Sequence, residues 1–202
     1  RTNWAHTSGE KRRAILHNGA AGRSFRAEPY AVRRKCVWGA MPAGYRDRVS
    51  GSLATFIAHS LLALAATEAD VAAALRNAEK VRCAALCISP IWVATAHSER
   101  IDREVRIATV IGFPSGAHTR TTKAFEAAEA VASGADEIDV VVDLGHLVAC
   151  NLDAVALELE LVRAMSLDRT MKVILETALL DSAQIRDACR VAVDCGADFV
   201  KT

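Results

Sequence analysis

The sequence VRIATVI-GFPSG, residues Val105–Gly116, carries the clearest fold signal in the chain. Its first part is a continuous apolar and β-branched run, which is typical of a strand buried on both faces of a sheet. The glycines and the proline that follow predict a loop at the end of that strand. An Ala/Glu-rich helix is then expected over Thr121–Ser133, with Gly134 closing it. The stretch therefore predicts one strand, loop and helix in succession.

The same alternation continues on both sides of this unit. Thr67 is the expected N-cap of a helix whose acidic first turn suits the helix dipole. Further helices are expected at Val93–Ser98, Leu152–Met165 and Asp181–Cys195. The chain should hold six strands, the others lying in the apolar run Leu53–Leu62 and at Ala84–Ser89, Glu137–Val142, Met171–Glu176 and Asp198–Lys201.

Continuous apolar strands separated by amphipathic helices indicate an α/β protein with a parallel sheet covered on both faces. A doubly wound sheet and a (β/α)8 TIM barrel both fit this pattern. The barrel is favoured because polar residues recur at the ends of the strands, where barrels place their active sites. These residues are Ser89, Asp139 with Asp143 just beyond it, Glu176 and Lys201. No GxGxxG or Walker motif follows a strand. Six strands predict an incomplete barrel that lacks its last two βα units.

The charge distribution divides the chain into two parts. Residues 1–50 carry 11 Lys/Arg against 3 Asp/Glu, whereas the remainder carries 14 against 21. The basic part shows no sustained helical or alternating period and is expected to be a disordered or non-native extension. A nucleic-acid-binding arm and an Arg-rich transit segment are the alternatives. Residues 51–202 are expected to form the partial barrel domain, and the opening Arg1 suggests a fragment.

The sequence shows no targeting segment and no metal-binding motif, so a cytoplasmic domain without a metal or cofactor is expected. No apolar run is long enough for a membrane span, and no signal peptide opens the chain. The six cysteines lack paired CxxC spacing, and no His/Cys/Asp grouping has metal-ligand spacing. Reduced, mostly buried thiols are therefore expected, and among them Cys87 lies in an apolar strand.

Lys201 is a candidate nucleophile. A lysine attacks a carbonyl only as the neutral amine, and burial at the end of an apolar strand disfavours the charged form. Imine formation with an aldehyde or ketone would follow. The alternative is a lysine that extends from a strand end into solvent.

Asp139 is a candidate proton relay. It interrupts an apolar strand, where an isolated buried charge would be costly. Imine chemistry needs a group that moves protons to and from the substrate, and an inward-facing aspartate near a lysine would serve. The alternative is a structural salt bridge with Lys172 on the neighbouring strand. His118, in the loop that follows Gly112–Gly116, is more typical of a hydrogen-bonding surface residue.

Four blocks together resemble deoxyribose-phosphate aldolase, in the family's order and spacing. They are TVIGFPSG at 109–116, GADEIDVV at 134–141, KVILET at 172–177 and GADFVKT at 196–202. The resemblance runs from about Leu53 to the end of the chain. It implies a class I aldolase on a (β/α)8 barrel that reversibly cleaves 2-deoxy-D-ribose 5-phosphate to D-glyceraldehyde 3-phosphate and acetaldehyde, without a metal.

The resemblance also implies roles for single residues. Lys201 matches the Schiff-base lysine of the family and Asp139 its proton-relay aspartate, while Cys87 matches a cysteine near the site and is expected to bind substrate. Thr202 is the first residue of the family's Thr-Ser-Thr-Gly loop and is expected to bind substrate. The expected partners are phosphosugar and aldehyde substrates and a further copy of the chain, with no nucleic acid and no membrane.

Three departures from the family pattern stand against these roles. Ala58 and Ala63 replace an acidic and a basic residue of the first-strand signature, and the loop after the lysine is present only as Thr202. The family's second lysine on the next strand and its phosphate-binding loops lie beyond the sequence. A catalytically silent, truncated remnant is therefore the alternative to an enzyme. Exposed edge strands also predict self-association.

Overall fold

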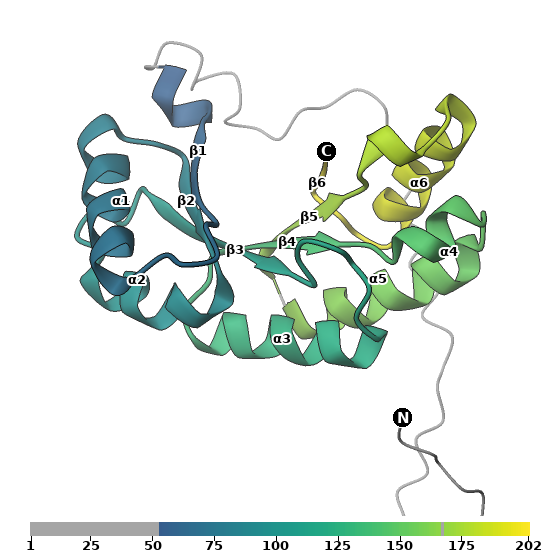
Figure 1. Cartoon of the computed structure of the whole chain (residues 1–202), viewed down its shortest axis with the longest axis horizontal. Coiled ribbons are helices and arrows are strands. Elements are labelled where there is room, and N and C mark those ends of the chain that lie inside the picture. Colours follow the sequence, from purple (N-terminus) through teal and green to yellow (C-terminus); the bar gives the residue numbers. More distant parts are fainter. Residues whose placement is uncertain (1–52, 167) are drawn as a thin grey trace, which may run out of the picture. The chain divides into compact units, whose positions relative to one another are not determined.

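A computed structural model describes residues 53–166 and 168–202, which form a curled, fully parallel sheet with helices on its outer side (Figure 1). The sheet has six strands in the order β1-β2-β3-β4-β5-β6. This sequential order confirms the barrel over a doubly wound sheet, whose strand order would reverse at one point. The strands are β1 (Ala58–Leu61), β2 (Ala85–Ile88), β3 (Arg106–Ile111), β4 (Glu137–Val141), β5 (Thr170–Ile174) and β6 (Phe199–Lys201).

The helices follow the strands in alternation and cover the convex side of the sheet (Figure 1). Thr67 caps α1 as expected, in a capping box with Asp70, and Asp181 forms a second capping box with Gln184 at α6. The helices are α1 (Glu68–Val81), α2 (Val93–Glu99), α3 (Arg120–Ala132), α4 (Leu144–Val148), α5 (Leu152–Ser166) and α6 (Ser182–Asp194). In the part of the chain that the structure describes, no helix combines the length and the apolar character that crossing a membrane requires.

Three short elements and several boundaries differ from the expectations; β5, for example, ends at Ile174 and not at Glu176. The apolar run Leu53–Leu62 is a strand only over β1, because Leu53–Phe56 forms a 3-10 helix. Two further 3-10 helices, η3 (Pro90–Trp92) and η4 (Thr177–Leu179), and helix α4 were not expected from the pattern. The expected extension over residues 1–50 lies outside the described residues.

The two faces of the sheet differ in chemistry. Side chains such as Leu86, Ile107 and Ile138 point outward and form the main core with the helices. The concave face carries a small apolar cluster on β2 and β3. It consists of Ala85, Cys87, Ala108 and Val110, with the partly buried Leu62 packed against it. Beside this cluster the same face carries buried charged side chains on β4. Strand alternation places these charges inside the curl and away from the helix layer.

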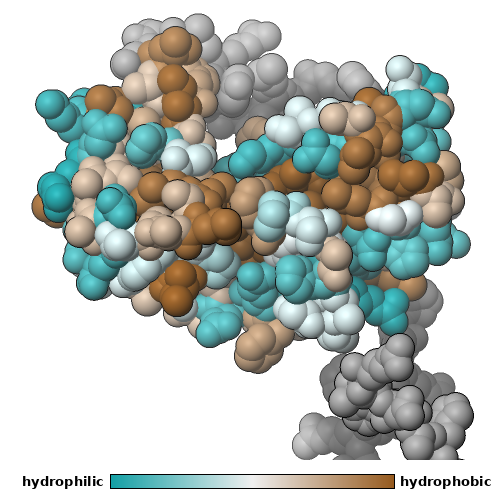
Figure 2. Space-filling view, in the orientation of Figure 1, coloured by the Kyte–Doolittle hydropathy of each residue, from teal (hydrophilic) through white to brown (hydrophobic). Residues whose placement is uncertain are grey.

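Both edge strands of the sheet lack a second strand neighbour in the described part of the chain. On β6, Phe199 and Val200 are 55% and 45% exposed. Apolar residues are also visible on the surface around β5 and β6 in Figure 2. This is the exposed edge from which the sequence predicts self-association.

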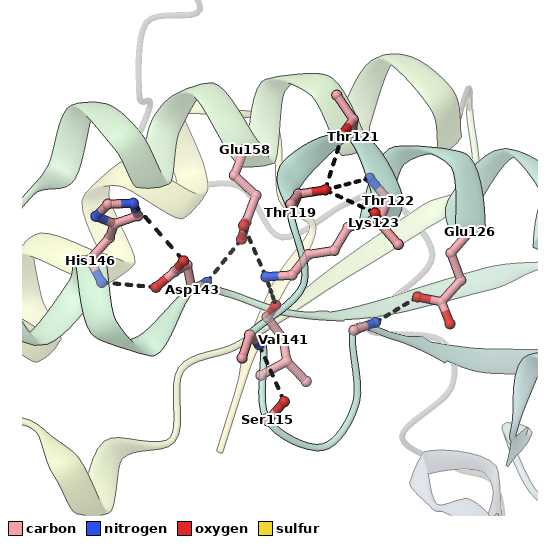
Figure 3. A network of polar contacts seen from close by, with 12 residues as sticks. Ser115, Thr119, Thr121, Thr122, Lys123, Glu126, Val141, Asp143, His146 and Glu158 are labelled. Carbon is pink, nitrogen blue, oxygen red and sulfur yellow. Dashed lines mark hydrogen bonds and ion pairs between the residues drawn. The ribbon is translucent and has the colours of Figure 1, made fainter. Parts of the chain in front are cut away.

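A buried ion pair joins α3, α5 and the end of β4 (Figure 3). Lys123 Nζ donates to Glu158 Oε2 at 2.9 Å and to the carbonyl oxygen of Val141 at 2.8 Å. The other carboxylate oxygen, Glu158 Oε1, accepts the backbone N–H of Asp143 at 3.0 Å. Burial raises the pKa of Glu158, although its contacts with Lys123 oppose that shift. Every oxygen of this carboxylate therefore has a partner, as a buried charge requires.

The same network fixes the loop Gly112–Gly116 at the end of β3. Gly112 N donates to Glu126 Oε2 on α3 at 2.8 Å, and the aliphatic part of Lys123 packs where a Cβ at position 112 would lie. Gly116 has a φ of +68°, and a Cβ there would lie 2.0 Å from the carbonyl oxygen of Val142. A side chain at either glycine would push the loop away from the sheet.

Candidate active site

Strand register brings the two expected site residues to the same face of the sheet. Asp139 lies directly opposite Lys172 in the β4–β5 pairing, and Lys201 lies opposite Ile174 in the β5–β6 pairing. Because side chains alternate along a strand, Asp139, Lys172 and Lys201 all face the concave side. The curl of the sheet then directs the three side chains toward one another.

Asp139 contacts both lysines. Its Oδ2 accepts a hydrogen bond from Lys201 Nζ at 2.8 Å, and its Oδ1 lies 3.2 Å from Lys172 Nζ. Asp139 is 1% exposed, so its charge depends on these two cations. The sequence left two readings of Asp139 open, a lysine-paired relay and a salt bridge to Lys172, and the structure shows the contacts that both require.

The charged group extends across β3 and β4. Glu137 Oε2 pairs with Lys172 Nζ in a short contact, and Glu137 Oε1 accepts from Arg106 Nη1 at 2.8 Å. The side chains thus alternate in charge in the order Arg106, Glu137, Lys172, Asp139 and Lys201. When Lys201 is a neutral amine, the other four balance in charge. The arrangement therefore accommodates a neutral lysine at its end without leaving a buried charge unpaired.

Lys172 is held as a cation by its two carboxylate neighbours. Burial acts to lower its pKa, but Asp139 and Glu137 together outweigh burial and raise the pKa above the usual value for lysine. Its side chain is 16% exposed, compared with 39% for that of Lys201. Lys201 is thus the lysine of the pair that a molecule entering from solvent can reach more easily.

Cys87 lies under this group on β2. Its Sγ is 4.0 Å from Asp139 Oδ2, and the residue is fully buried. Burial, followed by the neighbouring Asp139 carboxylate, raises the pKa of the Cys87 thiol to about 11. Cys87 therefore lies next to the candidate site as a neutral thiol at ordinary pH, which does not suit a nucleophile.

Thr202 faces a second hydroxyl at the end of the neighbouring strand. Its Oγ1 lies 2.6 Å from Oγ1 of Thr177, and it also accepts the backbone N–H of Thr177 at 3.4 Å. Thr202 is exposed and directly follows Lys201, whereas Thr177 is half-buried and begins η4 (Thr177–Leu179), beyond the carboxyl end of β5. This placement leaves their hydroxyl groups accessible to a polar ligand at the open end of the curl.

The remaining polar residues at the strand ends lie elsewhere. Asp143 caps α4 by accepting the backbone N–H of His146 (Figure 3), and Glu176 is exposed with a φ of +48°. Ser89 precedes η3 without a side-chain capping bond, and His118 is exposed on its loop. These four polar residues lie near the carboxyl ends of the strands, as expected, but none of them forms a hydrogen bond or an ion pair with Asp139 or the two lysines.

Ala58 lies opposite Ala85 at the start of β1, in register with the concave face. An acid at that position would face the interior of the curl, so the alanine removes a charge from the same side as Asp139. Ala63 follows the end of β1 and is exposed. Among the described residues, no group of His, Cys, Asp and Glu is arranged to hold a metal ion.

Sequence reasoning did not include Glu137 and Arg106 in the candidate site, and it considered Lys172 only as a structural partner of Asp139. The available signal was alternation, because Glu137 stands two residues before Asp139 and so faces the same side. Arg106 could not be found in this way, since its contact depends on the register between β3 and β4.

Comparisons with known proteins agree with this architecture. A sequence model described as DeoC/LacD family aldolase matches residues 51–202. A deoxyribose-phosphate aldolase of Mycobacterium tuberculosis (strain H37Rv) is 46% identical over 154 residues, covering 74% of this chain and 67% of the relative. A deoxyribose-phosphate aldolase of Streptococcus suis (strain 98HAH33) is 42% identical over 147 residues, covering 73% of this chain and 67% of the relative.

The fold is also similar to solved structures of aldolases. A tetrameric deoxyribose-phosphate aldolase from Aeropyrum pernix superposes with a TM-score of 0.68 at 30% identity, covering 77% of this chain and 67% of that one. A Coccidioides immitis protein superposes with a TM-score of 0.72 at 32% identity, covering 74% of this chain and 59% of that one. The chain thus spans about two thirds of the curated relatives and less of some structural ones.

Proposed function

Because the chain belongs to the DeoC/LacD family of aldolases, we propose that its protein is a deoxyribose-phosphate aldolase that acts through an imine on Lys201. The substrate would be 2-deoxy-D-ribose 5-phosphate, and the products D-glyceraldehyde 3-phosphate and acetaldehyde. The observation that carries the proposal is the 2.8 Å hydrogen bond between Lys201 Nζ and the buried Asp139 carboxylate. It places a proton acceptor beside the amine.

The first step is imine formation. The neutral amine of Lys201 attacks the aldehyde carbon of the open-chain sugar, and the resulting carbinolamine loses water to give an iminium ion. The leaving hydroxyl needs a proton and the amine must lose one. Asp139, in contact with Nζ, can accept the amine proton and return it to the hydroxyl.

The second step is carbon–carbon cleavage. Loss of the C3 hydroxyl proton lets the C2–C3 bond break, with its electron pair moving toward the iminium nitrogen. C3 leaves as the aldehyde carbon of the three-carbon phosphate, and C2 remains in an enamine on Lys201. Protonation of C2 and addition of water then release acetaldehyde and regenerate the amine. Asp139, directly or through a water molecule, is the proposed proton carrier in both directions.

Other residues of the region would bind rather than react. The hydroxyls of Thr202 and Thr177 lie beyond Lys201 and suit the hydroxyl groups of a sugar, while Cys87 forms a small, neutral wall behind Asp139. The proposed reaction needs no metal or cofactor. The proposed setting is cytoplasmic, and the exposed β6 edge supports association with further copies of the chain.

The test is a cleavage assay on the chain, following acetaldehyde release from 2-deoxy-D-ribose 5-phosphate in the presence of a metal chelator. Replacing Lys201 by Met should abolish turnover, because the lysine that remains beside Asp139, Lys172, is held as a cation and cannot attack the carbonyl. Lys80→Met is the matched control, since Lys80 is exposed on the outer helix α1 and should leave turnover unchanged. Activity that survives in the Lys201 variant, or is absent from the unmodified chain, contradicts the proposal.

A further inference from the structure

Two lysines share one carboxylate in this site. Lys201 Nζ lies 2.8 Å from Asp139 Oδ2, and Lys172 Nζ lies 3.2 Å from Asp139 Oδ1. Both are primary amines on the concave face, next to the same acceptor. An aldehyde that reaches this carboxylate therefore meets two potential nucleophiles, and imine formation on the wrong one would place the substrate in the wrong geometry.

The difference between the two lysines is a second carboxylate. Lys172 Nζ also pairs with Glu137, whereas the described residues give Lys201 no anionic partner other than Asp139. An adjacent carboxylate favours the charged form of an amine, and two favour it more strongly than one. A lysine retained as an ammonium ion has no lone pair and cannot attack a carbonyl.

A contact from β3 holds the Glu137 carboxylate beside Lys172. Its side chain is 6% exposed, and its second oxygen accepts from Arg106 Nη1 at 2.8 Å. This contact prevents the carboxylate from turning away from Lys172. It also means that Arg106 and Lys172 divide the charge of Glu137 between them, so removing Arg106 should strengthen the hold on Lys172.

We propose that Glu137 selects Lys201 as the imine-forming lysine by holding Lys172 as an ammonium ion. The inference rests on the proposed function, and it makes Glu137 a positioning residue that acts through Lys172 without touching substrate. The charged and titratable groups that face Lys172 are Glu137 and Asp139 on β4, Lys201 on β6, Arg106 on β3 and Cys87 on β2.

The test measures how fast each lysine reacts with trace acetic anhydride across a range of pH, by peptide mass mapping of the full chain. Only the neutral amine reacts, so the ratio of Lys172 to Lys201 labelling reports how strongly Lys172 is held as a cation. In Glu137→Gln the ratio should rise at least about tenfold at neutral pH, because one nearby opposite charge typically changes a pKa by one unit or more. Glu137→Asp keeps the charge and should restore a low ratio.

An unchanged ratio in folded Glu137→Gln protein overturns the inference. If that variant does not fold, Arg106→Gln decides, because Arg106 is partly exposed and its loss should lower the ratio below that of the unmodified chain. An unchanged or higher ratio in Arg106→Gln then overturns the inference.

A second arm repeats the mapping with acetaldehyde and borohydride, which trap only imines. The expected result is an adduct on Lys201 in the unmodified chain and adducts on both lysines in Glu137→Gln. If the unmodified chain gives no adduct, the proposed function fails, while the acetylation ratio still decides whether Glu137 holds Lys172 charged. An adduct confined to Lys201 in folded Glu137→Gln overturns the selection by Glu137.

Discussion

The lysine–carboxylate pairs Lys123–Glu158 and Lys201–Asp139 differ in how completely their polar atoms are satisfied. On the outer side of the sheet, Lys123 is fully buried and both oxygens of Glu158 have partners (Figure 3). On the concave side, the Lys201 side chain is 39% exposed, and Asp139 Oδ1 lies near Lys172 without a well-formed hydrogen bond.

The difference separates a structural pair from the pair that we propose to be reactive. A closed pair has no amine that solvent can reach, so its contribution is to hold α3, α5 and the end of β4 together. An open pair keeps an accessible amine and an acceptor that can take a proton. A lysine and a carboxylate thus hold the fold together in one place and are proposed to do chemistry in the other, according to burial and the number of partners.

After Lys201→Met, which should abolish cleavage, Asp139→Asn should give the largest effect on turnover. The amide keeps the size of the side chain but cannot carry protons, and general acid–base groups typically contribute about 10²- to 10⁴-fold to a rate. We therefore expect the rate of cleavage to fall by that factor. Circular dichroism should show that the variant remains folded. Cleavage within a few fold of the unmodified chain would show that Asp139 only pairs with the lysines.

Lys123→Met should give the largest effect on stability. It leaves Glu158 buried without its cation, and breaking a buried pair in this way typically costs about 3–5 kcal/mol. Denaturant unfolding measures the change, and a double variant with Glu158→Leu should recover much of the loss because no buried charge remains. A single variant as stable as the unmodified chain would refute the structural assignment.

The loss of stability in Lys123→Met should depend on pH, and its direction follows from the pKa of Glu158. Burial raises the pKa of Glu158 in the folded protein above its value in the unfolded chain, so the folded state binds the proton more tightly. The associated stability is present at acid pH and is lost as the pH rises through the folded pKa. Lys123→Met should therefore be least destabilising in acid, and a loss that grows toward low pH would contradict this reasoning.

Thiol labelling should have the smallest effect on turnover and stability, because it replaces none of the residues in the two lysine–carboxylate pairs. Cys150 is exposed, whereas Cys87 is fully buried with a pKa raised to about 11 by burial and by Asp139. At neutral pH iodoacetamide should alkylate Cys150 in the native chain and leave Cys87 unmodified, with Cys87 reacting only after denaturation. Rapid native alkylation of Cys87, followed by peptide mapping, would place a thiolate in the site and alter its chemistry.

Much of the fold could be predicted from the sequence because buried parallel strands are continuous apolar runs. β3 and β4 stand out in this way, and Thr67 was identified from the capping chemistry of α1. The five-residue helix α4 is too short to show a helical period. The 3-10 turn Leu53–Phe56 is apolar like a strand, so composition could not separate it from β1.

The candidate site was predicted less completely, because contacts between strands depend on register and curvature. A lysine at a strand end and an aspartate within a strand were visible as anomalies, and they were paired by family resemblance. The Lys172–Glu137 contact needed the β4–β5 register, and the Arg106–Glu137 contact needed that of β3–β4. Neither register can be predicted from the sequence pattern of one strand alone.

The most direct test of the central claim is to trap the imine with acetaldehyde and sodium borohydride and to map the modified peptide. The open pair on the concave face should gain one ethyl group on Lys201, and Lys123 of the closed pair should remain unmodified in the same digest. Lys201→Met should abolish the adduct. An adduct on a different lysine in the unmodified chain, or none at all, would contradict the assignment of Lys201 as the imine-forming residue.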